Sequence, residues 1–106
     1  MKHLHWAAIV VFACAGSALG QMNIISLDGT RTSDENESGG PRYLTAPAMR
    51  SATNSLLSAG FTIQTRPSFV GVTTQDACVL YTGTVNVDFT AQEIADTLAY
   101  VNSGGG

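Results

Sequence analysis

The sequence predicts an α/β protein with a partial, doubly wound parallel sheet of strand order 2-1-3 and two main helices. Three observations predict it: the strand candidates are short and apolar, both helical segments have their own start and stop signals, and the elements follow the order strand, helix, strand, strand, helix. Short, continuously apolar strands are typical of parallel sheets that helices cover on both faces. Right-handed crossovers then place the first strand in the middle.

Residues 1–20 resemble a secretory signal peptide. Lys2 precedes an apolar run, and Ala18-Leu19-Gly20 offers small residues at a cleavage site. The apolar run is shorter than the roughly 20 residues that a membrane-spanning helix needs. We therefore expect a secreted or periplasmic mature domain, residues 21–106, without membrane contact after cleavage. A membrane anchor, or a lipoprotein attached through Cys14, is the alternative.

Cleavage would remove both histidines and the only lysine. The mature chain could not then assemble Ser-His, Cys-His or His-metal chemistry, so we assign no catalytic residue. Four arginines against eight acidic residues give 4 − 8 = −4, which argues against a nucleic-acid partner. Cys78 would be the last cysteine, and we expect it to be buried as a small apolar residue, without an intramolecular disulfide.

The first strand and the first helix have clear limits. Residues 22–27 form a short apolar strand that Asp28-Gly29 ends, and a long polar loop follows. The helix is expected over residues 45–60, with Thr45 as N-cap, Pro47 in the first turn and Gly60 as the stop.

The second half of the chain supplies two strands and a helix. Residues 61–65 alternate as a half-buried or edge strand does, and residues 77–82 are continuously apolar. The last helix starts with the capping box of Thr90 and Glu93 and can end at Gly104. Its expected apolar face consists of Ile94, Leu98 and Val101, with Ala91 and Ala95 beside them.

Strand order 2-1-3 leaves the outer side of residues 77–82 without a neighbour. A bare apolar edge is a template for pairing with another chain. We therefore expect self-association or a partner protein at this edge. Because the chain stops at Gly106, where a fourth strand would follow, we also expect the front portion of a larger fold or a truncated gene product.

Four segments together point to a known fold family: "NIISLDG", "LLSAGFTI", "ACVLYTG" and "FTAQEIADTLAYVNSGGG". They resemble the N-terminal half of a secreted class I glutamine amidotransferase-like domain, of the flavodoxin-like group that includes ThuA-type proteins. It implies the fold but not amidotransferase activity, since the cysteine of catalytic relatives lies on a turn that would come after this point.

A polar ligand, such as a sugar, is expected at the carboxyl ends of the first and third strands, where ligands of open parallel sheets collect. The candidate binding residues are Asp28, Gly29, Thr30, Thr82, Gly83 and Thr84. Alternatively, Asp28 and Thr30 only complete an Asx-type turn.

Two patterns suggest a weak Ca²⁺ or Mg²⁺ site. Asp34, Asn36 and Ser38 reproduce the opening of a calcium loop, but Thr45 stands where a bidentate glutamate is required. Residues 28–32 read D-x-T-x-T, which is reminiscent of the metal-dependent adhesion site of von Willebrand A domains.

The main functional hypothesis is thus a small exported α/β module that is non-catalytic alone and binds a polar ligand or a partner chain. The alternatives are part of a hydrolase or sugar-processing site, with Asp28 as acid or base and a partner completing it, and a metal-dependent adhesion module.

Overall fold

The structure, a computed structural model, describes residues 22–31, 42–83 and 85–106. Its strands form one three-stranded sheet in the order β2-β1-β3, and both pairings are parallel. The predicted fold class and strand order are confirmed. The strands are β1 (Asn23–Leu27), β2 (Thr62–Arg66) and β3 (Val79–Tyr81).

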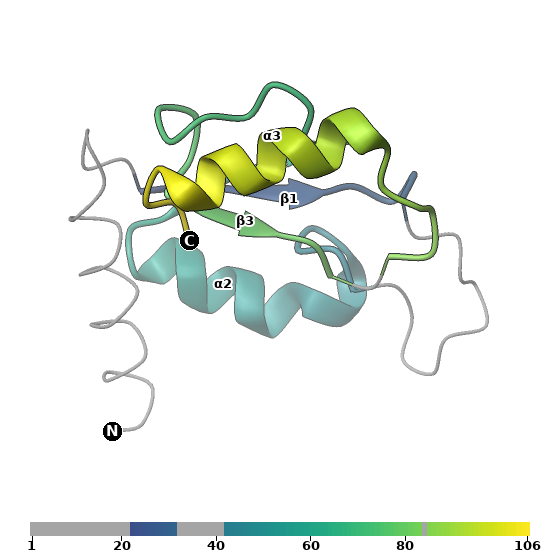
Figure 1. Cartoon of the computed structure of the whole chain (residues 1–106). Helices are drawn as coiled ribbons and strands as arrows, with labels where there is room; N and C mark the ends of the chain where they lie inside the picture. The colour runs from purple at the N-terminus through teal and green to yellow at the C-terminus, as the bar shows by residue number, and fades with distance from the viewer. Residues whose placement is uncertain (1–21, 32–41, 84) are drawn as a thin grey trace.

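Two helices lie on opposite faces of this sheet (Figure 1). A 3₁₀ turn, η1 (Pro47–Met49), leads into α2 (Arg50–Ser58) on one face, and α3 (Ala91–Asn102) lies on the other. Side chains alternate across a strand, so Ile24 of β1 joins the core on the α2 side and Ile25 joins the core on the α3 side. No helix in the described ranges is long and apolar enough to cross a membrane.

The ends of α2 follow the sequence signals only in part. Pro47 is in the first turn, as predicted, but the residue before the 3₁₀ turn is Ala46 and no side chain caps it. The prediction of Thr45 as N-cap is therefore wrong, because the helix starts later. At the other end, Gly60 has a φ of 98°, a conformation that glycine adopts readily, and the predicted stop is confirmed.

The predicted apolar face of α3 is not the face that the helix buries. Ile94, Leu98 and Val101 are 47%, 57% and 53% exposed, and the helix instead buries Glu93 and Tyr100. The Tyr100 ring packs into the core on the α3 side and its hydroxyl donates to the carbonyl of Ala77 at 3.1 Å. Helix α3 is thus rotated so that its apolar stripe faces outward.

The capping box of α3 forms only half of its reciprocal pair. The amide of Glu93 donates to the Thr90 hydroxyl at 3.1 Å, as predicted. The Glu93 carboxylate turns instead toward Arg31, Ser68 and the amide of Phe69. Glu93 therefore joins α3 to the loops that follow β1 and β2.

The glycines at the end of α3 have separate structural roles. Gly104 has a φ of 98° and its amide donates to the Val101 carbonyl of the helix at 3.0 Å, so the predicted cap is confirmed. A Cβ on Gly105 would lie 2.0 Å from the Tyr100 ring, which only a glycine avoids. Gly106 then reaches the outer edge of β3 and forms two backbone hydrogen bonds there. The start of this edge is therefore occupied, contrary to the expectation of a bare edge.

Cys78, at the start of β3, is 4% exposed in the core on the α2 side, which confirms the expected burial. Its sulfur is disulfide-bonded in the full chain. This differs from the expectation for the mature chain, in which Cys78 would be the last cysteine.

Candidate functional site

The loop after β1 places Asp28 and Thr30 at the carboxyl edge of the sheet. The Asp28 carboxylate accepts hydrogen bonds from the amide of Thr30, at 2.9 Å, and from the Thr30 hydroxyl. This is the Asx-type turn that the sequence offered as the alternative to a ligand site. Ligand binding by these residues stays a prediction.

Gly29 and Gly83, at the ends of β1 and β3, both lie against residues 42–43. A Cβ on Gly29 would be 3.2 Å from the Tyr43 ring, and one on Gly83 would be 2.5 Å from the carbonyl oxygen of Arg42. The Tyr81 hydroxyl donates to that same carbonyl at 3.0 Å, and burial raises the pKa of Tyr81. Residues 42–43 thus occupy space between the two predicted halves of the ligand site.

The remaining candidates are less informative. Thr82 is exposed, and its hydroxyl donates to the neighbouring carbonyl of Gly83 at a long 3.4 Å. Thr84 lies outside the described residues, as do the candidate metal ligands Asp34, Asn36 and Ser38. Within residues 22–31, 42–83 and 85–106, no three His, Cys, Asp or Glu side chains gather as a metal site would require.

A buried ion pair, Arg31 with Glu93, is the main polar feature near the carboxyl ends of the strands. The Nη1 atom of Arg31 donates to both carboxylate oxygens of Glu93, at 2.8 and 2.7 Å. The guanidinium also donates to the carbonyls of Pro67, Val87 and Asp88. The pair therefore holds together the loops that follow all three strands.

This ion pair was missed in the sequence. Arg31 looked like one residue of a polar loop, and Glu93 had a local explanation as a capping residue. The available signal was a lone arginine next to a strand end and a lone glutamate at a helix start, 62 positions apart. The Arg31 guanidinium also lies over the Phe89 ring, 5.0 Å from its centre, while its buried Nε has no partner in the described part of the chain.

The ion pair makes the stability of the domain depend on pH in the acid range. Burial tends to raise the pKa of Glu93, but hydrogen bonds from Arg31, Phe69 and Ser68 together hold it below its ordinary value of 4.5. A lowered pKa in the folded state contributes stability above the ordinary pKa, and this stability is lost as the pH falls toward the folded-state pKa.

We therefore expect the free energy of unfolding to fall as the pH is lowered from about 6 to about 3. Urea denaturation measures it at each pH. The Glu93→Gln variant, which cannot titrate at this position, is the control and should lose less over the same interval. Equal losses of unfolding free energy for the wild-type and Glu93→Gln proteins would contradict the assignment of this pH dependence to Glu93.

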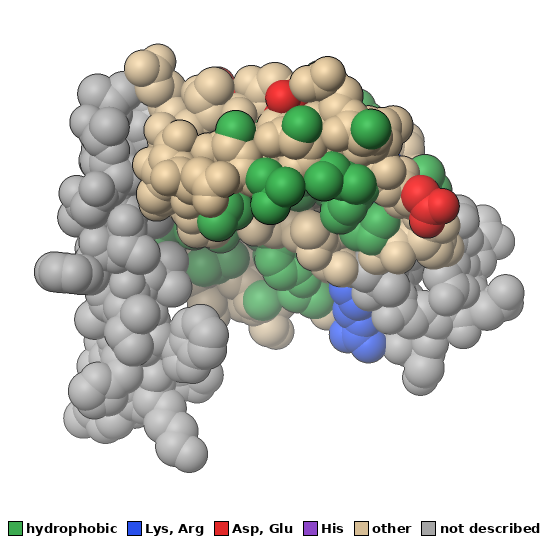
Figure 2. All heavy atoms as spheres, viewed as in Figure 1, with side chains coloured by type: hydrophobic (Ala, Val, Ile, Leu, Met, Phe, Trp, Pro, Cys, Tyr) green, Lys and Arg blue, Asp and Glu red, His purple; other side chains and the backbone are tan. Residues whose placement is uncertain are grey.

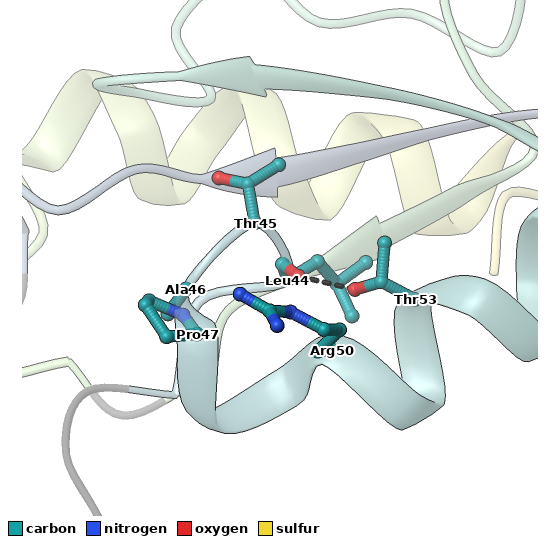
Figure 3. Close-up of a pocket in the computed structure, with 6 residues that line it drawn as sticks. All are labelled: Leu44, Thr45, Ala46, Pro47, Arg50 and Thr53. Carbon is teal, nitrogen blue, oxygen red and sulfur yellow. Dashed lines mark hydrogen bonds between the residues drawn. The ribbon is translucent and has the colours of Figure 1, made fainter.

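A shallow hollow of about 220 Å³ lies at the start of α2. Figure 3 shows Arg50 and Thr53 of α2 on one side and the loop from Leu44 to Pro47 on the other. The Thr53 hydroxyl donates to the Leu44 carbonyl and fixes the loop against the helix. Arg50 and Thr45 are exposed, so the hollow is open to solvent.

A contiguous apolar surface is the second candidate site, and we name it the α3/β3 surface. Figure 2 shows its hydrophobic side chains over α3 and in the recess below that helix, toward β3. Its members on α3 are spaced as one helix face, and Val79 to Tyr81 are half-buried below them. We define it by Ala91, Ile94, Ala95, Leu98 and Val101 of α3 and by the outer edge of Val79–Tyr81.

The two edges of the sheet differ in character. β2 presents Thr62, Gln64 and Thr65, all exposed and polar, which is how soluble proteins protect an edge from other strands. β3 consists of Val79, Leu80 and Tyr81. Only the β3 edge therefore has the apolar character that favours contact with another chain.

No protein-family model, curated protein or solved structure matches this chain.

Proposed function

We propose that the chain is a small exported α/β module that binds another protein chain along the α3/β3 surface. The observation that carries the proposal is the outward rotation of α3. Ile94, Leu98 and Val101 are about half exposed on a helix that buries a glutamate. Burying a fully exposed side chain of this kind contributes about 1.5–3 kcal/mol, so a partner that covers these half-exposed side chains gains roughly half of that for each of them.

The apolar character of the surface supports a protein partner rather than a small polar ligand. Contiguous exposed apolar patches of several hundred Å² mark protein interfaces more often than chance exposure does. All the α3 residues of this surface are uncharged: Ala91, Ile94, Ala95, Leu98 and Val101. A second copy of this acidic chain can therefore approach it without direct charge repulsion at its centre.

The amidotransferase-like relationship and the export of the mature domain remain part of this proposal. The strand order 2-1-3 is what that resemblance implies, and it supports the relationship at the level of fold. The signal-peptide pattern of residues 1–20 supports export.

Self-association is the direct test. Sedimentation velocity of the chain as a cell exports it should show concentration-dependent association. Leu98→Glu places a charge in the middle of the α3/β3 surface and should weaken association by about 10-fold or more, since it loses the remaining burial of a half-exposed leucine, worth roughly 1–1.5 kcal/mol, and adds the cost of removing a charge from water.

The matched control is Val70→Glu. The exposed fraction of Val70, 49%, is close to the 57% of Leu98, but Val70 lies in the loop after β2 and outside the α3/β3 surface. It should leave association unchanged, and both variants should keep the wild-type far-UV circular dichroism. Association that is insensitive to Leu98→Glu, or equally weakened by Val70→Glu, would refute the proposal.

A further inference from the structure

Arg31 is the anchor of two loops at the carboxyl edge of the sheet. Its backbone belongs to the loop after β1, and its guanidinium donates to the carbonyls of Val87 and Asp88 in the loop after β3, at 3.1 and 3.3 Å. The Arg31 carbonyl also accepts a hydrogen bond from the Asn86 amide at 3.1 Å. The two loops are therefore joined to each other through one residue.

These two loops contribute few buried side chains to the domain. Gly29 and Thr30 are exposed, and so are all four residues from 86 to 89. Among residues 29–31 and 86–89, only Arg31 is buried. Segments with few buried contacts open at a lower free energy than the core of a domain does. We therefore expect both loops to be able to open while the sheet stays folded.

Glu93 attaches Arg31 to parts of the domain that belong to the core. Its carboxylate accepts from Arg31 and also from the Phe69 amide, at 2.8 Å. The Phe69 ring and, further along α3, the Tyr100 ring lie in the core on the α3 side, and each residue is 1% exposed. The ion pair thus connects two lightly packed loops to a well-packed frame.

We propose that the Arg31–Glu93 ion pair is a latch that makes the loops after β1 and β3 open and close as one unit. The proposal goes beyond the proposed function and does not depend on the α3/β3 surface. It concerns the predicted ligand site, because residues 28–30 and 82–83 belong to the same two loops. A polar ligand that bridges these loops would need the latch to be closed.

Protonation of Glu93 is the event that would open the latch. Arg31 supplies the charge that acts on this carboxylate, and the loop after β2 contributes uncharged donors. The acidic side chains on the neighbouring segments are Asp28, Asp88 and Asp96. Because the hydrogen bonds hold the pKa of Glu93 below 4.5 in the closed form, this form loses stability as the pH falls from 4.5 toward the lowered pKa.

Hydrogen exchange of two amides, measured by NMR on the full chain and corrected for intrinsic rates, tests the latch. The Arg31 amide, bonded to the Asp28 carbonyl, reports on the loop after β1, and the Asn86 amide reports on the loop after β3. In Glu93→Gln, both should lose protection by the same factor, about 10- to 100-fold, as for lost hydrogen bonds to a charged group. The Ile25 amide, in the central strand, should stay more protected than both.

The matched control is Asp96→Asn. Asp96 also lies on α3 and accepts an amide from the loop after β2, that of Gly71, at 2.7 Å, but it lies outside the ion pair. This variant should lower the protection of the Gly71 amide and leave Arg31 and Asn86 unchanged. Unequal changes at Arg31 and Asn86 in Glu93→Gln, or equal changes in both variants, would overturn the latch.

The wild-type chain supplies a second measurement, which stays decisive if Glu93→Gln fails to fold. As the pH is lowered from about 6 to about 3, the Arg31 and Asn86 amides should lose protection by a common factor. Constant protection over this interval would overturn the proposal. Protection equal to that of the Ile25 amide would also overturn it, because the loops would then open only when the whole domain unfolds.

Discussion

Replacing Glu93 by leucine is expected to destabilise the domain by about 3–5 kcal/mol, because Arg31 would remain buried without a carboxylate opposite it. The side chains of Glu93 and Arg31 are 1% and 9% exposed, and one guanidinium nitrogen, Nη1, donates to both carboxylate oxygens. Domains of this size are marginally stable. Urea denaturation followed by circular dichroism should show a largely unfolded Glu93→Leu protein in dilute buffer.

The double variant Arg31→Met with Glu93→Leu is the control for this experiment. It removes both charges and keeps apolar volume at both positions, which is often neutral or stabilising for a buried pair. It should recover most of the lost stability. A deficit of about 1–3 kcal/mol should remain, because the buried amide of Phe69 loses its acceptor on Glu93. A Glu93→Leu protein as stable as the wild type would contradict the structural role of the pair.

The sheet could be predicted because its signals are local. Each strand is a short apolar run with a turn after it, and the glycines that end the helices stand where a positive φ is required, at Gly60 and Gly104. Once the order of elements is known, the handedness of crossovers leaves few topologies. Strand order 2-1-3 follows from these steps without any knowledge of side-chain contacts.

The orientation of α3 could not be predicted in the same way. The spacing of Ile94, Leu98 and Val101 correctly identifies an apolar stripe, but a periodic pattern does not say which layer the stripe faces. The sheet instead receives Glu93 and Tyr100, which have specific partners in Arg31 and the Ala77 carbonyl. These partners are distant in the sequence, so no local pattern indicates them.

The candidate ligand site could be predicted only in part, because some of its contacts are local and others are distant in the sequence. Strand ends predict that Gly29 and Gly83 lie at one edge of the sheet, and both contact residues 42–43 there. The long polar loop before Tyr43 has no periodic pattern that could have indicated this contact. Its interior, residues 32–41, contains the predicted Ca²⁺ or Mg²⁺ ligands and lies outside the described residues.

Truncation of Tyr100 should destabilise the domain far more than truncation of Leu98. A buried apolar stripe on α3 would predict the reverse. Tyr100→Ala is expected to cost about 3–5 kcal/mol of unfolding free energy, as for other large buried aromatic residues, because Tyr100 is 1% exposed and packs against Phe69 and Ala77. Leu98→Ala should change it by no more than about 0.5 kcal/mol. Thermal and urea denaturation of the two variants, at concentrations below self-association, measure both values.

Tyr100→Phe separates packing from hydrogen bonding in this experiment. It keeps the ring and leaves the buried carbonyl of Ala77 without its donor, which costs about 1–3 kcal/mol. A larger loss for Leu98→Ala than for Tyr100→Ala would mean that the apolar stripe is buried, and the α3/β3 surface would then not exist in solution. The expected order, with Tyr100→Ala most damaging and Leu98→Ala least, holds only if the core anchors α3 through Tyr100 and leaves Leu98 available to a partner.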